Sequence, residues 1–190
     1  MKSKIIIENY SFENFISLSS DDHKDILRLR NQEIVRKWMF DKSKISKDQH
    51  NDFIAKLNKD ETKLYLMVKR NNKFIGVYSL VNILNSSGQG GFYISDYARK
   101  KKLAVEFLFY CFEFIFSHTG INMIYGSEAL ENKNAFSLNR FFGFYDVIGE
   151  QIIYKDENMY RYGELYKNDF KKIRSSPKIN DLLEYSAKIK

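Results

Sequence analysis

Short apolar runs and amphipathic stretches alternate along the N-terminal third of the chain. Ile5–Ile7 and Phe15–Leu18 are runs of strand-forming residues, and we predict a strand at each. Ser20–Asp22 supplies N-cap residues, and the apolar stripe behind it predicts a helix that ends near Arg30. A second helix is predicted to begin at Ser46, where the sequence has the form of a capping box.

The middle of the chain is predicted to form strands. Leu64–Val68 has the composition of a buried strand, Asn71–Lys73 that of a turn, and Phe74–Val81 that of the returning strand of a hairpin. Ser86–Gly91 is rich in glycine and predicts a break before a strand at Phe92–Ser95. Glycines at the entrance of a strand often mark a bulge or a close approach of two backbones.

The C-terminal half opens with the most apolar stretch of the chain. Lys102–Ser117 predicts a helix that is apolar on nearly all sides and is therefore central and buried. A strand is predicted at Asn122–Ala129 and a short helix at Asn132–Phe142. Tyr145–Tyr154 and Met159–Tyr166 flank a turn, and we predict that they form a hairpin.

This order of elements indicates a mixed α/β (α+β) fold with a hairpin-rich middle, not a doubly wound parallel sheet. A chain of 190 residues has room for one compact core. We predict a single domain over residues 1–170 and a basic C-terminal tail over residues 171–190. Within this tail a short helix, residues 180–188, is expected after Pro177.

Composition and charge narrow the range of functions. Lys and Arg outnumber Asp and Glu by 31 to 24, and the net charge of +7 favours a polyanionic ligand. The single cysteine, Cys111, excludes an internal disulfide, and the histidines lack metal-ligand spacing, so we predict no metal. No apolar run suits a signal peptide or a membrane span, so we expect a cytoplasmic protein with no membrane partner. Interleaved basic and aromatic residues are missing, so we expect no nucleic acid partner.

Positive charge is concentrated at one place, in Arg99–Lys102, between a predicted strand and the longest predicted helix. Free amides and the positive end of the dipole at a helix N-terminus form an anion site, to which neighbouring Arg and Lys side chains add charge. A solvated basic turn is the alternative interpretation of such a run.

Two motifs in register with these elements resemble signatures of the GNAT acetyltransferase superfamily. Arg99-Lys100-Lys101-Lys102-Leu103-Ala104 stands where that superfamily has its acetyl-CoA loop, Arg/Gln-x-x-Gly-x-Gly/Ala. Residues 131–144, ENKNAFSLNRFFGF, are similar to its second signature. The resemblance covers about residues 5–166. It implies a three-layer fold in which a mixed, mostly antiparallel sheet is splayed at its centre and flanked by helices.

A closer resemblance lies nearer the N-terminus, in Leu29–Glu33, Lys37–Met39 and the spacing of Ile45-Ser46 to His50. These residues are similar to N-acetyltransferases of nucleotide-linked 4-amino-6-deoxy sugars, as in pseudaminic acid biosynthesis. The Arg30-Asn31 pair also resembles ribosomal-protein N-terminal acetyltransferases, so a protein or peptide amine stays open as the acceptor. The resemblance implies acetyl-CoA as cosubstrate and a small-molecule nucleotide amino sugar as partner, and it leaves a homodimer open.

The same resemblance implies roles for individual residues. Backbone groups of Phe92, Tyr93 and Ile94 would hold the pantetheine arm as an additional strand, and one of their amides would face the oxyanion. Asn132 would contact the far side of the cofactor. The diphosphate would lie on the amides of Arg99, Lys100, Lys101, Lys102, Leu103 and Ala104. The acceptor would meet Arg30, Trp38, Met39 and His50; ordinary core packing is the alternative for Trp38.

Three positions depart from the superfamily pattern. Lys102 replaces the loop glycine, and its side chain restricts the backbone where close approach to phosphate is needed. Gln89 stands where a glutamate base is common, and Asn139 stands where a tyrosine acid is expected. An amide donates a hydrogen bond to the leaving sulfur but delivers no proton.

Other residues are candidates for the missing chemistry. Tyr145, close to the second motif, is an alternative acid, and Glu128 and His50 are candidate bases beside Asn139. A tyrosine packed on the sheet, a solvated carboxylate and a surface histidine are the structural alternatives. A non-catalytic module that binds acyl-CoA or a partner therefore stays open beside the enzyme.

Overall fold

One open sheet organises the computed structural model, which describes residues 4–155 and 158–187. Its described strands lie in the order β1-β2-β3-β4-β5-β6-β8-β7. Neighbouring strands are antiparallel except for β5 and β6, which are parallel, so the expected mixed and mostly antiparallel sheet is confirmed. The strands are β1 (Lys4–Ile7), β2 (Tyr10–Asn14), β3 (Leu64–Arg70), β4 (Lys73–Leu84), β5 (Ser87–Ile94), β6 (Met123–Ala129), β7 (Gln151–Lys155) and β8 (Asn158–Tyr166).

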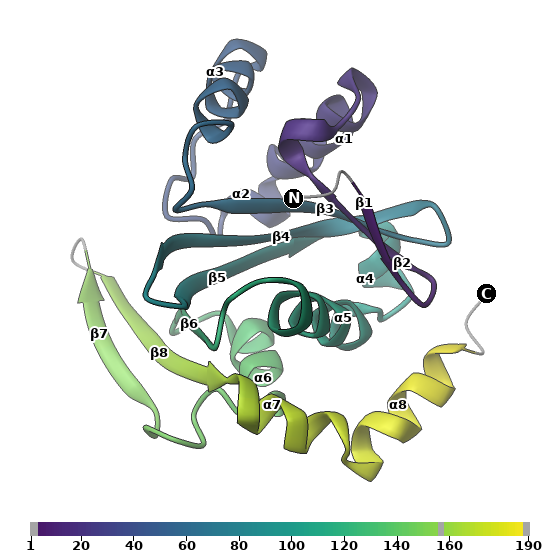
Figure 1. Ribbon diagram of the computed structural model, residues 1–190. Coiled ribbons are helices and arrows are strands. Elements are labelled where there is room, and N and C mark those ends of the chain that lie inside the picture. The colour runs from purple at the N-terminus through teal and green to yellow at the C-terminus, as the bar shows by residue number, and fades with distance from the viewer. Residues whose placement is uncertain (1–3, 156–157, 188–190) are drawn as a thin grey trace.

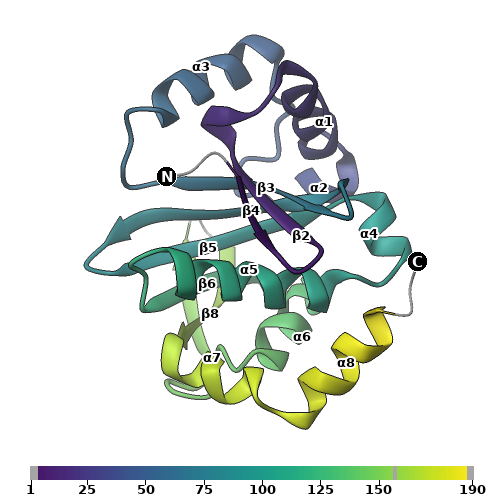
Figure 2. The same cartoon turned by 45° about the vertical axis from the view of Figure 1, so that its right-hand side comes forward.

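Helices cover both faces of this sheet, which gives the expected three layers (Figures 1 and 2). α1 and α3 lie on one face, α5 and α6 lie on the other, and α7 and α8 continue the chain on the α5 side. The helices are α1 (Ser20–Arg30), α2 (Glu33–Arg36), α3 (Lys47–Leu57), α4 (Asp96–Lys100), α5 (Ala104–His118), α6 (Lys133–Phe141), α7 (Lys167–Arg174) and α8 (Pro177–Ala187), with a 3-10 turn, η1, at Phe15–Ser17.

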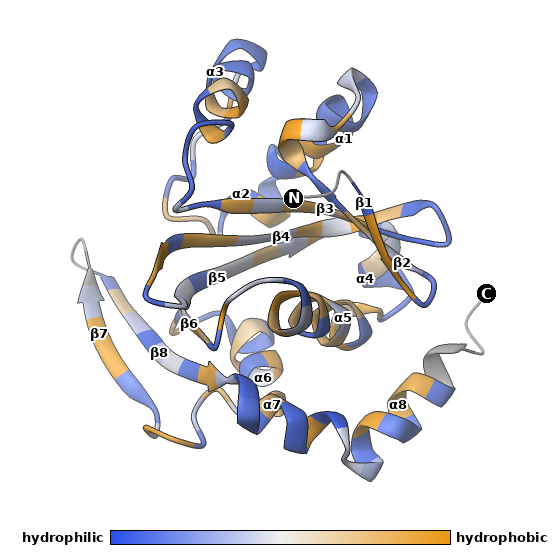
Figure 3. Ribbon diagram, in the orientation of Figure 1, coloured by the Kyte–Doolittle hydropathy of each residue, from blue (hydrophilic) through white to orange (hydrophobic). Residues whose placement is uncertain are grey.

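The larger part of the core lies between α5 and the sheet, as the apolar sequence of this helix predicts. Phe107, Phe112 and Ile115 of α5 are buried against Tyr78 and Ile124 of the sheet. Figure 3 shows apolar residues concentrated on the strands and on α5. A smaller cluster on the other face joins η1, α1 and α3 to β3 and β4. Each helical layer is thus fixed to the sheet by its own apolar contacts.

The sheet opens between its two parallel strands. β5 and β6 pair only at Ser87–Met123, Gly88–Ile124 and Gln89–Tyr125, although both strands continue beyond these pairs. At the opening, a Cβ atom on Gly90 would lie 2.8 Å from the Tyr78 hydroxyl and 2.9 Å from Ile124. The predicted close approach at the glycines is confirmed, and the edge of β5 that faces β6 is left unpaired from Gly90 onward.

Several local predictions are confirmed by the hydrogen bonds that cap and turn the chain. Ser46 and Gln49 form the capping box of α3. Asn71 and Asn72 make the tight β3–β4 turn with φ of 49° and 62°, and asparagine tolerates this left-handed conformation. Strands β7 and β8 form the predicted hairpin, pairing as far as Lys155 and Asn158.

Four predicted boundaries are wrong for physical reasons. Phe15–Leu18 is not a strand, because Asn14 accepts a hydrogen bond from the amide of Ile16 and turns the chain into η1. The glycine-rich segment does not break the sheet: β5 begins at Ser87 and runs through it.

The basic segment is partly helical, because the Ser95 hydroxyl caps α4, and the long helix α5 begins only at Ala104. Finally, Tyr145–Tyr154 is not one strand. Gly143 and Gly149 adopt φ of 74° and 71°, and backbone turns occupy this segment before β7 begins at Gln151.

The predicted domain boundary at residue 170 falls inside α7. Phe170 and Ile179 are both buried in the main core, so the two C-terminal helices pack on the same core as α5. The division into domain and tail stays a prediction, and the last residue of the predicted helix, residue 188, lies outside the described part.

Candidate functional site

A cleft of about 1200 Å³ lies where β5 and β6 diverge. Its lining comes from both faces of the sheet. Ala104, Leu108 and Leu138 line it on the face covered by α5 and α6, here called the α5 side. Arg30 and Phe53 line it on the opposite face, here called the α1 side. The cleft therefore extends through the opening, from the α5 side of the sheet to the α1 side.

On the α5 side the structure brings together part of the predicted cofactor set. The lining residues from that set are Phe92, Tyr93, Ile94, Arg99, Lys102, Ala104 and Asn132. Lys100, Lys101 and Leu103 do not line the cleft; Leu103 is fully buried in the core. The unpaired edge of β5 thus runs beside the N-terminus of α5, which no side chain caps.

Arg99 is held by its own neighbours. Its guanidinium donates to the carbonyl oxygen of Ile94 at 2.7 Å and to Gln32 Oε1 at 3.2 Å, and it forms an ion pair with Asp96. These bonds tie α4 to the end of β5. The arginine fixes the loop at least as much as it supplies positive charge to the cleft.

Lys102 adopts a φ of 56°, in the left-handed region where glycine is favoured. This backbone conformation agrees with the sequence interpretation that a side chain is unfavourable at this position. Lys102 nevertheless lines the cleft immediately before α5, so its charge adds to the positive end of the α5 dipole.

Glu128 joins two other predicted residues into a buried cluster at the α5 side. Asn139 of α6 donates from Nδ2 to Glu128 Oε2 at 2.7 Å, and the Tyr145 hydroxyl donates to Glu128 Oε1. Burial raises the pKa of Glu128, while the hydrogen bonds from Tyr145 and Asn139 and the nearby Arg161 oppose this shift. Both carboxylate oxygens are therefore occupied as acceptors.

The three members of this cluster face different surroundings. Glu128 and Asn139 line the cleft, whereas Tyr145 does not. Burial and the neighbouring carboxylate of Glu128 raise the pKa of Tyr145 far above its usual range. Asn139 is therefore in contact with the cleft, whereas the Tyr145 hydroxyl bonds Glu128 from outside it.

On the α1 side, the segment 41–45 is tied to α1 and α2 by side chains that bond its backbone. Arg30 donates to the carbonyl oxygen of Asp41 at 2.8 Å, and Arg36 donates to that of Lys42 at 2.6 Å. Asn31 donates to the carbonyl oxygen of Ile45 and accepts from its amide, both at 2.8 Å. These anchors were missed as such from the sequence, where only the Arg-Asn pair stood out.

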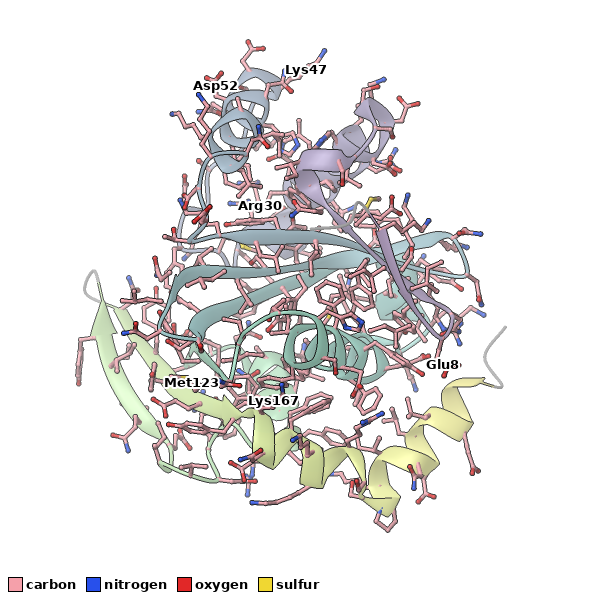
Figure 4. All side chains as sticks on the ribbon, in the orientation of Figure 1. Glu8, Arg30, Lys47, Asp52, Met123 and Lys167 are labelled. Carbon is pink, nitrogen blue, oxygen red and sulfur yellow. The ribbon has the colours of Figure 1, made fainter. Side chains whose placement is uncertain are left out.

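Arg30 lines the cleft and has one donor atom without a partner in the described part of the chain. Figure 4 shows it between the α1 and α3 layer and the sheet. Its Nη1 is buried and has no hydrogen-bond partner among the described residues. Burial lowers the pKa of Arg30, and charge interactions with Tyr93, Asp41 and Tyr65 oppose this shift. A cation with an unused donor on a cleft wall is suited to an anionic or carbonyl group of a ligand.

Aromatic surface lies beside this cation. Trp38 is 41% exposed and Phe40 is 53% exposed, and both line the cleft together with Met39. Lys37 lies over the Trp38 ring, 5.0 Å from its centroid. Trp38 is therefore no core residue, and the α1 side offers a flat aromatic surface near positive charge.

His50 is buried, only 7% exposed, and lines the cleft from α3. Its Nε2 lies 3.2 Å from Nδ1 of His23 on α1. His23 was missed from the sequence, because residues on two helices far apart along the chain give no spacing signal. The alternative interpretation of His50 as a surface histidine is therefore wrong.

Within residues 4–155 and 158–187, no group of three or more His, Cys, Asp and Glu side chains is arranged to hold a metal ion. No described helix combines the length and apolarity that crossing a membrane requires.

Comparison with known proteins adds family evidence to this geometry. The family model described as an acetyltransferase (GNAT) domain matches residues 14–144. Two curated relatives from Campylobacter jejuni strains, both called acetyltransferase PseH, are 33% and 35% identical over 81 residues. The match covers 43% of this chain and 51% of each relative, so the chain spans about half the length of the curated relatives it matches.

Solved structures show the same fold. Campylobacter jejuni N-acetyltransferase PseH in complex with acetyl coenzyme A has a TM-score of 0.63 at 22% identity, over 83% of this chain and 98% of that chain. Spermidine N-acetyltransferase from Vibrio cholerae in complex with CoA and spermine has a TM-score of 0.73 at 19% identity, over 86% and 99%. These likenesses confirm the three-layer fold with its mixed sheet.

Proposed function

Because the chain belongs to the GNAT acetyltransferase family, we propose that it transfers an acetyl group from acetyl-CoA to a primary amine held on the α1 side of the cleft. The observation that carries this proposal is the unpaired edge of β5 beside the uncapped N-terminus of α5. Backbone groups from Gly90 to Ile94 are free there to bond an extended amide chain, as a neighbouring strand would.

The cleft suits acetyl-CoA in charge as well as in shape. Its diphosphate would lie at the N-terminus of α5, where free amides, the helix dipole and Lys102 provide positive potential. The pantetheine arm would follow Phe92–Ile94, which brings the thioester to the opening of the sheet. Asn132 would contact the cofactor from the start of α6.

The chemistry requires an amine near the thioester carbonyl, a donor for the oxyanion and an exit for the thiolate. A backbone amide on the open edge of β5 would serve the oxyanion. Asn139 would donate its second amide hydrogen to the leaving sulfur, because the first is bonded to Glu128. A thiol with a pKa of about 8.5 leaves tolerably as a thiolate, so a hydrogen bond can replace a full acid.

We further propose that the acceptor amine is carried by a nucleotide-linked amino sugar. Arg30 offers an unused donor for a phosphate, and Trp38 offers an exposed ring for a base. A polyamine, which is a polycation, would meet Arg30 and Lys37 on the same wall and be repelled. The partial similarity to PseH supports the same class of acceptor.

The test has two stages. Calorimetry should show acetyl-CoA binding that weakens as salt rises, because phosphate contacts are screened; absence of binding at low salt would exclude the proposed activity. Steady-state assays should then show turnover with a UDP-linked 4-amino-6-deoxy sugar, and faster acetylation of a peptide N-terminus or of spermidine would exclude the sugar.

A matched pair of variants locates the acceptor. Trp38→Ala should raise the KM for the sugar about tenfold and leave the KM for acetyl-CoA unchanged, because a stacked base contributes about 1–3 kcal/mol. Leu84→Ala, at an exposed position that does not line the cleft, is the control.

A further inference from the structure

The two histidines of the α1 side form a defined pair. α1 and α3 lie on the same face of the sheet (Figures 1 and 2), and they bring His23 Nδ1 to 3.2 Å from His50 Nε2. Their ring centroids are 5.2 Å apart and the angle between the ring planes is 67°. The two rings therefore meet edge-on through these nitrogen atoms and are not stacked. Of the two, His50 lines the cleft.

The short contact between the two rings restricts where their hydrogens lie. When both rings are neutral, one of the two facing nitrogens, His23 Nδ1 or His50 Nε2, carries a hydrogen and the other accepts it. Where His50 donates from Nε2, its Nδ1 is left as an unprotonated nitrogen, and no described residue bonds that atom.

The surroundings disfavour the charged form of both rings. Burial lowers the pKa of His23, although the Phe15 backbone and Asp22 oppose this shift, and burial together with the charge of His23 lowers the pKa of His50. Asp22 of α1 is itself paired with Lys69 of β3 at 2.8 Å, and Lys69 also lies 3.8 Å from Glu13 of β2. The ring of Phe15 meets the His23 ring edge-on at a centroid distance of 6.2 Å, and it packs in turn on Tyr65.

We propose that His50 Nδ1 is the base that takes a proton from the acceptor amine, and that His23 is the positioning residue that holds His50 in this tautomer. This inference rests on the proposed acetyl transfer. Glu128 is less suited to the same task, because both of its oxygens already accept hydrogen bonds.

The acceptor arrives as an ammonium; one N–H bond breaks, its proton joins His50 Nδ1, and the nitrogen keeps the electron pair. That nitrogen forms a bond to the thioester carbonyl carbon, the carbon–sulfur bond breaks, and the thiolate leaves. The second proton of the nitrogen goes to the thiolate, giving the CoA thiol, and the His50 imidazolium releases its proton to solvent.

The tautomer can be measured without turnover. The chain contains only three histidines, at 23, 50 and 118, so long-range ¹⁵N–¹H spectra of the wild-type protein can be assigned with single variants. We expect both His50 and His23 to be neutral at pH 7, each with its hydrogen on Nε2. A hydrogen on Nδ1 of His50, or a doubly protonated His50 at this pH, would overturn the inference.

Kinetics test the role. His50→Gln should lower kcat/KM for the acceptor by about 100-fold and abolish the acid limb of its pH profile. His23→Leu should lower it about tenfold and move the acid limb to higher pH, because the second ring that depresses the pKa of His50 is gone. His23→Asn should restore most of the loss, since its side-chain oxygen can accept from His50 Nε2. His118→Gln, at an exposed position, is the matched control.

The outcomes separate this inference from the proposed function. A wild type that turns over, with His23→Leu giving the same pH profile as the control, would refute the positioning role alone. A wild type that binds acetyl-CoA and acetylates no amine would refute the proposed function and the proton transfer with it.

Discussion

Replacing Asn139 by alanine tests how the leaving group departs. The Asn139 amide bonds Glu128 at 2.7 Å and lines the cleft, so its remaining N–H is available to a developing thiolate. A hydrogen bond to a charged group contributes about 1.5–3 kcal/mol, which corresponds to roughly a 10- to 150-fold loss of kcat.

The same substitution has a second, separable effect. It leaves Glu128 Oε2, on a residue only 6% exposed, without its donor. Such a loss costs about 1–3 kcal/mol, so the melting temperature should fall by about 2–10 °C for a chain of this size. Tyr145→Phe removes the other donor to Glu128 from outside the cleft and should show a similar fall with a much smaller loss of rate.

The assay is the steady-state release of CoA at saturating acetyl-CoA, with thermal unfolding measured on the same samples. Arg140→Ala, at the exposed neighbouring position on α6 and outside the cleft, is the control for helix perturbation. Wild-type kcat in Asn139→Ala would show that this amide does not act at the sulfur. Equal rate losses in Asn139→Ala and Tyr145→Phe would show that both act only through Glu128.

Three further predictions follow from the α5 side. Lys102→Gly and Lys102→Ala should both weaken acetyl-CoA binding in calorimetry. Only glycine adopts the positive φ without strain, so the Lys102→Gly protein should be about 1 kcal/mol more stable than the Lys102→Ala protein in urea unfolding. Because the pKa of Glu128 is raised, its contribution to stability is full below pH 4.5 and is lost as pH rises through the folded pKa; Glu128→Gln should therefore gain melting temperature relative to wild type at pH 8 and not at pH 4. Gly90→Ala places a Cβ 2.8 Å from the Tyr78 hydroxyl, so it should lower the free energy of unfolding by about 1–3 kcal/mol and weaken acetyl-CoA binding. At Gly88 the nearest atom would lie at 3.4 Å, so Gly88→Ala should change neither stability nor binding.

The sequence predicted most of the fold because its signals there are local. The Ser46 capping box and the Asn71-Asn72 turn each act within a few residues, and the apolar surface of α5 needs no knowledge of its partners. Predictions failed where one residue type serves two purposes. The glycines before Phe92 were expected to break the sheet, but they permit a strand to pass over Tyr78.

The site was harder to predict for the same reason, because the role of a polar side chain depends on distant partners. Arg99 has the charge of a phosphate ligand, yet it bonds the carbonyl oxygen of Ile94 and Gln32 from α2's N-terminal boundary. The sequence spacing marked His50 as a candidate site residue, whereas His23 becomes a candidate only through its contact with His50 across α1 and α3. Contacts between residues far apart in the chain leave no trace in a single sequence.

The anchoring of the segment 41–45 determines which substitutions this segment can accept. Arg30, Asn31 and Arg36 hold this segment entirely through its main-chain oxygens and one main-chain amide. Every amino acid supplies a main-chain oxygen, so these anchors do not depend on the side chains of Lys42 and Ile45, whereas the Asp41 carboxylate also accepts from the Ser43 amide at 2.8 Å. The side chains at positions 42 and 45 can therefore vary while the segment keeps its anchors, and a library randomised at these two positions should yield mostly folded proteins.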